Sequence, residues 1–248
     1  MRIETGKIDW LTKYHHGYVV GPELTKHALL KTDGLALQYW GIYNWATPRL
    51  PEIEFAGTVR ALFVEKGRLE VGIENGLFTI NEGTYLVVGP RGKPRIHSTC
   101  DNARGYIARW PAEETSSMYA VQTGVTAHLE QTFSQWTIGH FLGQKNAYNP
   151  LLTTTACELK RWRHNGPINY PPAIFGGECE FITVEQGMIA IIFCSRDMSA
   201  PMTKIIGRGE YCAIGSNIEK IVHVVEAPTC GLTLRWPSYR NIQTHTAS

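Results

Sequence analysis

Short runs of β-branched and aromatic residues, separated by turn residues, make up much of the first half of the chain. Several runs alternate apolar and polar positions, which is the period at which a strand buries one face and exposes the other. Asn75-Gly76 separates two of these runs, and both residue types tolerate the positive φ angles of a tight hairpin turn. The pattern predicts strands over residues 59–64, 68–73, 77–80, 85–88, 94–98 and 105–110.

The chain also repeats its own pattern. Residues 83–97 align without a gap with residues 209–223, and Gly, Tyr, Gly and His recur in register. After each of these histidines the tripeptide Arg-Trp-Pro follows at the same distance, at 109–111 and 235–237. Upstream matches place residues 63–67 over 183–187, and Gly21, Leu29, Leu30 and Trp40 over Gly143, Leu151, Leu152 and Trp162. We infer an internal duplication that spans most of the chain.

The repeats set the predicted domain organisation. Residues 1–111 form an N-terminal repeat and residues 137–248 a C-terminal repeat. Between them, residues 112–136 carry the only helical periodicity, at 112–122 and 127–136, and are expected to form a short helical linker. Six or more antiparallel strands per repeat, arranged as two paired sheets, predict an all-β chain of two tandem jelly-roll β-barrels.

Two motifs carry a family resemblance. Val64-Glu65-Lys66-Gly67 precedes the Asn-Gly hairpin, and Glu82-Gly83-Thr84-Tyr85-Leu86-Val87-Val88-Gly89-Pro90-Arg91-Gly92 leads into the next strand. This order resembles the cupin superfamily, whose units run through a V-L-x-G turn and a G-x-x-x-x-x-P-x-G turn. The chain therefore looks like a bicupin, which implies a ligand pocket at the mouth of each barrel.

The resemblance also indicates where a pocket would place its side chains. Metal-bearing cupins use an H-x-H pair, a Glu and a second-motif His, which together offer four N/O ligands. The family's Glu position falls on Arg60 in the first repeat and on Glu180 in the second, while residues 52–56 and 172–176 hold no histidine. We therefore expect pockets that lack the usual metal-binding histidine cluster, and no cofactor, although a divalent metal stays open as an alternative.

The candidate ligand-binding residues differ between the repeats. Arg60, Arg95 and His97 would suit an anionic ligand, because guanidinium groups pair bidentately with carboxylate or phosphate. Glu180 and His223 would suit proton transfer near neutral pH. No catalytic residue is assigned.

Structural roles compete with each of these assignments. Arg60 and Arg95 lie equally well on an outer sheet face, and His97 and His223 equally well donate a ring N–H to a carbonyl. For other residues the structural role is the preferred interpretation: stacking or an ion pair for Arg109 and Arg235, a solvated loop for Glu52 and Glu54, a surface or interface position for His15, His16, His27, His140 and His164, and an inert buried thiol for Cys179.

Composition and charge exclude several classes of binding partner. The chain has 248 residues and a net charge of +2, with no Lys/Arg run, which argues against nucleic acid and against an anionic membrane surface. Its longest apolar run, at 188–194, is far shorter than the roughly 20 residues of a spanning helix, and residues 1–10 lack the apolar core of a signal peptide. The six cysteines form no C-x-x-C pair. We expect a cytoplasmic protein with mostly buried thiols, whose partner is a small polar or anionic molecule.

The sequence leaves three functions open. The favoured one is a small-molecule-binding protein with degenerate, metal-free pockets. The second is a metal-independent enzyme, an isomerase, epimerase, cyclase or lyase, that uses Arg/His or Glu/His acid–base chemistry. The third is a self-assembling structural module, and the aromatic segments at 39–45 and 136–141 favour a homodimer. A sugar-sensing transcription regulator is disfavoured, because no helix-turn-helix segment is found.

Overall fold

The computed structural model is built from strands, and no helix occurs among the residues it describes. The expected all-β fold is confirmed. The described residues are 3–7, 18–21, 30–31, 36–41, 58–73, 76–89, 92, 94–99, 103–111, 122–125, 130–132, 136–143, 150, 152–153, 157–175, 179–194, 200–236 and 242–244. In this part of the chain no helix is long and apolar enough to cross a membrane.

Contacts divide the chain into two compact units. Residues Asp9–His128 form what we call the N-terminal unit. Leu129–Ser248 together with Met1–Ile8 form the C-terminal unit, so the start of the chain belongs to the unit built by its second half. The proposed repeat boundaries at 111 and 137 remain a prediction about the sequence.

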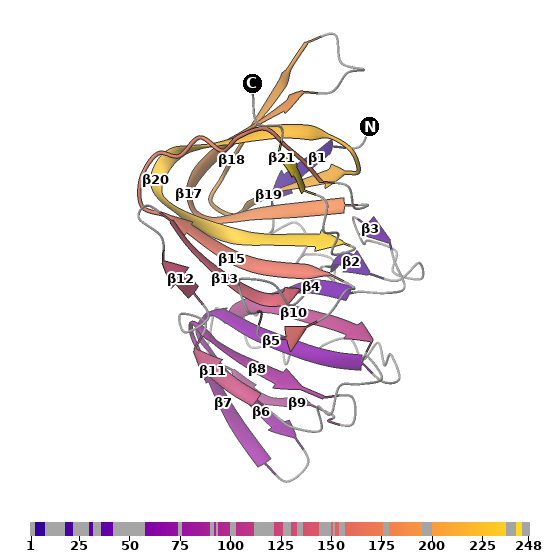
Figure 1. Cartoon of the computed structure of the whole chain (residues 1–248). Coiled ribbons are helices and arrows are strands. Elements are labelled where there is room, and N and C mark those ends of the chain that lie inside the picture. The colour runs from indigo at the N-terminus through magenta and orange to yellow at the C-terminus, as the bar shows by residue number, and fades with distance from the viewer. Residues whose placement is uncertain are drawn as a thin grey trace. The chain divides into compact units, whose positions relative to one another are not determined.

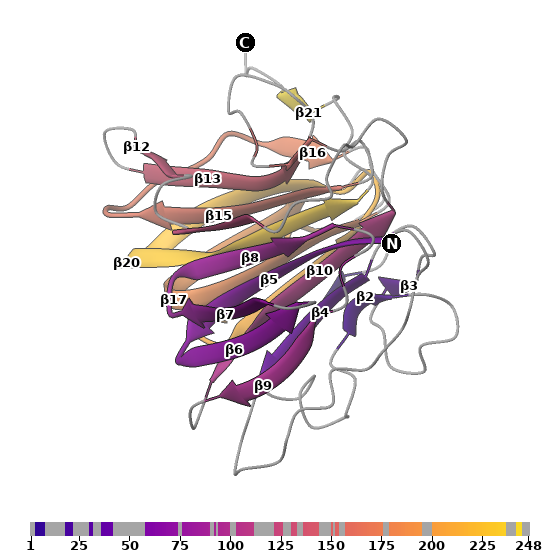
Figure 2. The same ribbon diagram turned by 90° about the horizontal axis from the view of Figure 1, so that it is seen from below.

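The N-terminal unit holds two sheets. The larger has the strand order β11-β8-β5-β10-β4-β2-β3, and the smaller the order β7-β6-β9 (Figure 2; β11 is labelled in Figure 1). Their bounds are β2 Tyr18–Gly21, β3 Leu30–Lys31, β4 Ala36–Gly41, β5 Thr58–Lys66, β6 Arg68–Ile73, β7 Gly76–Asn81, β8 Thr84–Val88, β9 Arg95–Thr99, β10 Arg104–Pro111 and β11 Gln122–Val125. The six predicted strands of this region are confirmed to within two residues at each end.

The C-terminal unit holds one sheet, whose main path is β1-β19-β17-β20-β15-β13-β12. Its two longest strands, β17 and β20, pair over most of their length and curve together in Figure 1. The bounds are β1 Ile3–Lys7, β12 Glu130–Thr132, β13 Trp136–Gly143, β14 Leu152–Thr153, β15 Glu158–His164, β16 Ala173–Phe175, β17 Cys179–Cys194, β18 Met202–Gly207, β19 Glu210–Gly215, β20 Glu219–Trp236 and β21 Ile242–Thr244.

The helical linker was a wrong prediction where the structure describes it. Residues 122–125 form β11 and pair with β8, and residues 130–132 form β12 and pair with β13. A strand at a sheet edge gains ladder hydrogen bonds that the weak helical periodicity of these segments does not outweigh. The first expected helix, at 112–122, otherwise lies outside the described residues.

Turn glycines at repeat-equivalent positions adopt the same conformation in both units. Gly67 and Gly187 have φ angles of 84° and 75°, and Gly83 and Gly209 have 70° and 77°. The Gly83 amide donates to the Val64 carbonyl at 2.9 Å, and the Gly209 amide donates to the Val184 carbonyl at 2.8 Å. Glycine is required at such positions because positive φ strains residues with a Cβ. Each turn directs the chain from one strand pair into the next.

Strands β1 and β11 also pair with their neighbours in similar registers. In β1, Gly6 lies opposite Tyr211 of β19, and in β11, Gly124 lies opposite Tyr85 of β8. The sequences Glu4-Thr5-Gly6 and Gln122-Thr123-Gly124 are correspondingly alike. A Cβ added at Gly6 would lie 2.7–2.9 Å from the Tyr211 ring, so this glycine lets strand and ring approach closely.

Candidate functional site

A row of charged side chains crosses three neighbouring strands of the C-terminal unit. Glu158 of β15 lies opposite Arg235 of β20, and Arg235 lies opposite Glu180 of β17. Side chains alternate between the faces of a strand, so residues directly opposite share a face. Ile182 lies two positions after Glu180 in β17, on the same face, and belongs to the hydrophobic core. The charged row therefore lies on the core-facing side of the sheet.

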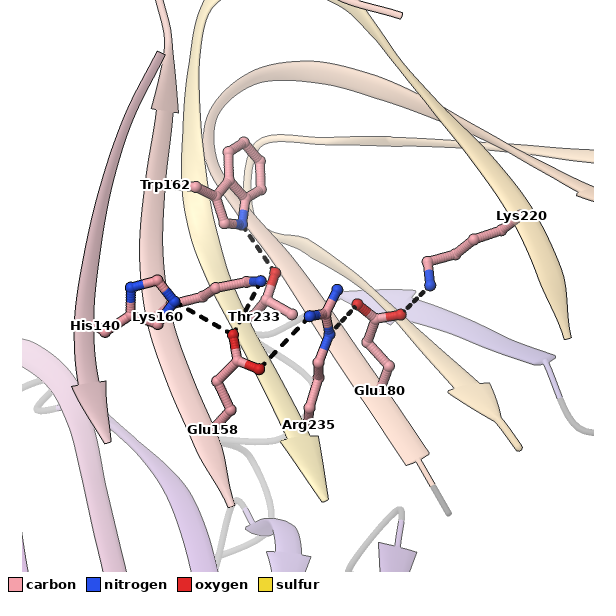
Figure 3. Close-up of polar contacts among 8 residues, drawn as sticks. All are labelled: His140, Glu158, Lys160, Trp162, Glu180, Lys220, Thr233 and Arg235. Carbon is pink, nitrogen blue, oxygen red and sulfur yellow. Dashed lines mark hydrogen bonds and ion pairs between the residues drawn. The ribbon is translucent and has the colours of Figure 1, made fainter. Parts of the chain in front are cut away.

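Arg235 links the two carboxylates of this row (Figure 3). Its Nε donates to Glu180 Oε1 at 3.0 Å, and its guanidinium also lies 3.5 Å from Glu158 Oε2. Glu180 is 2% exposed, which means that its charge must be compensated by the protein. Stacking or an ion pair was the preferred sequence interpretation of Arg235, and of these two the ion pair is found here.

Lys220 completes the compensation of Glu180. Its ammonium pairs with Glu180 Oε2, and the lysine is itself 5% exposed. Lys220 lies near the start of β20 and Arg235 near its end, so the curvature of this one strand brings both cations to the same carboxylate. We call the six residues His140, Glu158, Lys160, Glu180, Lys220 and Arg235 the charged cluster.

Glu158 collects the other members of the charged cluster. Lys160 Nζ lies 3.0 Å from Glu158 Oε1, and His140 Nε2 lies 3.4 Å from the same oxygen. His140 is buried, and so is His164 on the same sheet. The prediction that these two histidines are surface or interface residues was wrong, because they face the core side of β13 and β15.

The charges shift each other's protonation equilibria. Burial raises the pKa of Glu180, but the Lys220 ammonium and the Arg235 guanidinium lower it more, so that it falls from its ordinary 4.5 to about 2. For Glu158 the opposing effects of burial and of Lys160, His140 and Arg235 also leave the pKa far below its usual range. Burial, followed by the nearby Arg235 charge, lowers the pKa of Lys160. Both carboxylates are thus ionised at neutral pH.

The charged cluster has more cations than anions. Lys160, Lys220 and Arg235 contact its two carboxylates, and His140 also contacts Glu158. Trp162 and Thr233 lie next to the charged cluster. The indole Nε1 of Trp162 donates a hydrogen bond of 3.1 Å to the Thr233 hydroxyl. Ammonium and guanidinium groups are the side chains that commonly bind a small anion.

A second polar pair lies further along β15. Tyr170 Oη and His164 Nε2 are 3.0 Å apart, and the His164 ring packs against Trp162 and Tyr170. Burial lowers the pKa of His164 and raises that of Tyr170 to about 12, so both stay neutral at physiological pH. The tyrosine hydroxyl and the neutral imidazole therefore share one hydrogen bond, and the tautomer of the ring decides which of them donates.

The structure does not bring Glu180 and His223 together. His223 is half-buried, and its Nδ1 lies 2.5 Å from Asn169 Oδ1. In the sheet register His223 pairs with Ala190, far along β17 from Glu180. No contact between Glu180 and His223 is found among the described residues.

The three candidates of the first repeat are distributed over two sheets. Arg60 lies in β5, and its guanidinium donates to the Gly92 carbonyl at 2.9 Å. Arg95 is exposed and lies in β9, in the smaller sheet. His97 lies in the same strand where the pairing of β9 with β6 shifts register, and its side chain lies outside the described residues.

Comparison with known proteins identifies the fold. No protein-family model and no curated protein matches the sequence. Among solved structures, a putative glyoxylate-induced protein from Pseudomonas aeruginosa matches with a TM-score of 0.58 at 11% identity, over 89% of this chain and 95% of that one. This chain has a cupin fold. A cupin 2 conserved barrel domain protein from Leptotrichia buccalis (TM-score 0.53, 11% identity, 95% and 89% covered) and a Bacillus subtilis oxalate decarboxylase variant (0.55, 8%, 86% and 71%) are also similar.

The charged cluster is a poor fit to the metal set of metal-bearing cupins. Glu158, Glu180 and His140 are possible ligands by residue type, but each carboxylate is already in contact with ammonium and guanidinium groups. A divalent cation there would have to displace the ammonium and guanidinium groups that already contact these carboxylates. Within the described ranges, no group of three or more His, Cys, Asp or Glu side chains is arranged to hold a metal.

Sequence reasoning found only Glu180 of the charged cluster as a binding residue. Lys160 and Lys220 belong to no sequence motif that contains Glu180. Their contacts with the carboxylates of the charged cluster depend on which strands are neighbours in the sheet. Arg235 was noted through its recurrence as Arg109, but recurrence favoured a structural role. The alternation of Glu158, Lys160 and Trp162 along one strand was the signal that could have placed two more members on one face.

Proposed function

We propose that the C-terminal unit of this cupin-fold protein binds a small organic carboxylate at the charged cluster without a metal ion. The supporting observation is the buried set of three cations around two carboxylates. A bound carboxylate would accept charge-assisted hydrogen bonds from Lys160 or Lys220. The adjacent Trp162 and Thr233 would provide an apolar surface and a hydroxyl for the rest of the ligand.

Calorimetric titration of the purified chain with small mono- and dicarboxylates tests this proposal. We expect saturable binding to one or more of them, weakened about tenfold or more in Lys220→Met and restored in part by Lys220→Arg. Lys160→Met provides a second variant in case Lys220→Met unfolds. Arg163→Gln is the matched control, because Arg163 is exposed on the other face of β15. Equal affinity in the Lys220 and Lys160 variants would refute the site, as would no binding by the wild type.

The same site supports a second function, a metal-independent isomerase or lyase. Lys160 has a lowered pKa because it is buried, and it contacts Glu158, so a lysine that gives up its proton more readily than usual lies in the proposed site. Such an enzyme would remove the proton next to the carboxylate of its ligand. Incubation of bound carboxylates in D₂O, followed by NMR, tests this function: loss of the α-proton signal that depends on Lys160 supports it, and binding without exchange supports the binding protein.

We also infer that the chain is a bicupin formed by internal duplication. The matching φ angles of Gly83 and Gly209 and the matching strand registers around Tyr85 and Tyr211 support this origin. Gly83→Ala and Gly209→Ala are expected to destabilise the protein by a similar 1–2 kcal/mol, because both place a Cβ at positive φ. Unequal losses in denaturant unfolding would count against equivalent turns.

The proposed oligomeric state and cellular location do not depend on the charged cluster. A homodimer is proposed from the aromatic segments alone, and light scattering coupled to size exclusion would give the mass that decides it. A cytoplasmic location remains a prediction, which fractionation of cells that express the untagged chain would test.

A further inference from the structure

The charged cluster has a more accessible end and a buried end. The side chains of Lys160 and Glu158 are 14% and 18% exposed, and that of Arg235 is 12% exposed. Those of Glu180 and Lys220 are 2% and 5% exposed. Figure 3 shows the two lysines on either side of the Arg235 guanidinium. Of the two ammonium groups, a small molecule therefore reaches that of Lys160 more easily.

The surroundings of Lys160 favour a reactive amine. Burial and then the nearby charge of Arg235 lower its pKa below the ordinary 10.5, and the carboxylates of Glu158 and Glu180 oppose this shift without cancelling it. A lowered pKa increases the fraction of the lysine that is neutral at neutral pH. The neutral amine is the form that attacks a carbonyl carbon, and lysines that do so are often desolvated or next to another cation.

A hydroxyl group accompanies this amine. Thr233 of β20 lies directly opposite Lys160 of β15, so the two side chains share a face of the sheet. The Thr233 hydroxyl accepts a hydrogen bond from the Trp162 indole, and a hydroxyl that accepts one hydrogen bond can still donate its own proton. When an amine attacks a carbonyl carbon, negative charge develops on the carbonyl oxygen, and a donor at that point stabilises it.

We propose that Lys160 forms an imine with a small oxo-carboxylate, an organic acid whose ketone or aldehyde carbon is bonded to its carboxylate. This inference rests on the proposed carboxylate site and names the class of ligand that the site takes. The Lys160 nitrogen forms a bond to the carbonyl carbon, and the bond between that carbon and its oxygen breaks. Two of the three ammonium protons leave with the oxygen as water, and the third stays on the imine nitrogen.

The charges of the site suit this product. The protonated imine carries one positive charge on the same nitrogen as the ammonium group, which lies 3.0 Å from Glu158 Oε1, so the contact with this carboxylate is kept. The carboxylate of the ligand is bonded to the carbon that Lys160 attacks, and Arg235 is the cation whose charge acts on Lys160. The positive imine nitrogen also accepts the electron pair of a neighbouring C–H bond when that bond breaks, which is the step that an isomerase requires.

Reductive trapping with pyruvate and cyanoborohydride tests the proposal. Cyanoborohydride delivers a hydride to an imine carbon, so peptide mass spectrometry finds a carboxyethyl group on each lysine that has reacted. At neutral pH we expect Lys160 to be labelled about tenfold or more faster than Lys66, which is exposed and lies in the N-terminal unit. Lactate has the same carboxylate but a hydroxyl in place of the ketone. It should slow the labelling of Lys160 and leave that of Lys66 unchanged.

Lys160→Arg separates the covalent reaction from the effect of charge. Arginine keeps the positive charge but has no amine that forms an imine, so we expect labelling at this position to vanish while lactate still binds in calorimetry. Lys66→Arg is the matched control and should leave the labelling of Lys160 unchanged. Circular dichroism checks that each variant folds. The comparison of Lys160 with Lys66 uses the wild type, so the test stays decisive if Lys160→Arg does not fold.

The outcomes separate this inference from the proposed function. Rapid labelling of Lys160 that lactate slows supports the inference. Labelling of Lys160 no faster than that of Lys66 overturns it, and the proposed function then stands if lactate or another carboxylate binds in a way that depends on Lys220. Absence of both labelling and carboxylate binding refutes the inference and the proposed function together.

Discussion

Lys220 and Arg235 lie near opposite ends of one strand, β20, yet both contact the carboxylate of Glu180. Strand residues so far apart in sequence meet only where the strand curves strongly. The contact therefore ties the curvature of the C-terminal sheet to a buried ion pair. The consequences for stability, acid sensitivity and packing can each be measured.

Removal of the Glu180 charge should destabilise the protein strongly. Glu180→Gln leaves Lys220 and Arg235 buried with less compensation, and loss of one partner of a buried ion pair costs about 3–5 kcal/mol. Denaturant unfolding followed by circular dichroism gives the free energy of unfolding. Glu226→Gln, at an exposed position of the same strand, should change it by less than about 0.5 kcal/mol. Similar values for the two variants would mean that the ion pairs contribute little.

Stability should fall in acid through the same carboxylate. The pKa of Glu180 is lowered from 4.5 to about 2 in the folded protein, so the folded state takes up its proton less readily than the unfolded chain. Stability is then fully present above about pH 4.5 and is lost as the pH falls toward about 2. The unfolding free energy of the wild type, measured from about pH 6 to about pH 3, should decline more steeply than that of Glu180→Gln. Parallel curves would contradict the lowered pKa.

Close packing at Gly231 should not tolerate a methyl group. A Cβ there would lie 1.9 Å from the Thr183 carbonyl oxygen and 2.7 Å from the Trp162 ring, and the oxygen belongs to backbone that cannot move freely. We expect Gly231→Ala to lower the unfolding free energy by about 3 kcal/mol or more. Gly166→Ala is the comparison, because nothing lies within 4 Å of its added Cβ. A loss below about 1 kcal/mol at Gly231 would indicate a more open sheet.

The thiols should differ in reactivity according to burial. None of the five described cysteines is in a disulfide; Cys157 and Cys212 are buried, and Cys194 is half-buried. Burial raises the pKa of Cys157 and of Cys212 to about 12, so at about pH 8 only about one in ten thousand of these thiols is ionised. Iodoacetamide should label Cys194 well before these two, as read by peptide mass spectrometry. Rapid labelling of Cys157 in the folded protein would contradict its burial.

The strands could be predicted well because residues that are neighbours in the sequence determine them. The strand predicted at 68–73 is found at Arg68–Ile73, since side-chain alternation and turn residues mark both of its ends. The helix predicted over 127–136 was wrong at residues 130–132, where a weak helical period lost to strand pairing at a sheet edge. The buried thiols could also be anticipated from composition.

The candidate site could be predicted only in part because its causes are not local. Glu180 was found through the repeat, which compares positions and not contacts. Lys160 and Lys220 could not be found in this way, because their proximity to Glu158 and Glu180 depends on strand order and on the curvature of β20. The pairing of Arg60 with Arg109 likewise follows from the register of β5 against β10, which cannot be read from the sequence.

Strand β1 has a consequence for synthesis of the chain. Ile3 pairs with Ile214, so the partner of this strand is translated more than two hundred residues later. At about 5–20 residues per second, β1 waits on the order of 10–40 s while the N-terminal unit is completed. During that interval its hydrogen-bonding edge is open to other chains. Chaperone capture of the nascent protein is therefore expected at β1, and a bulky group attached beside Ile3 would impair folding of the C-terminal unit.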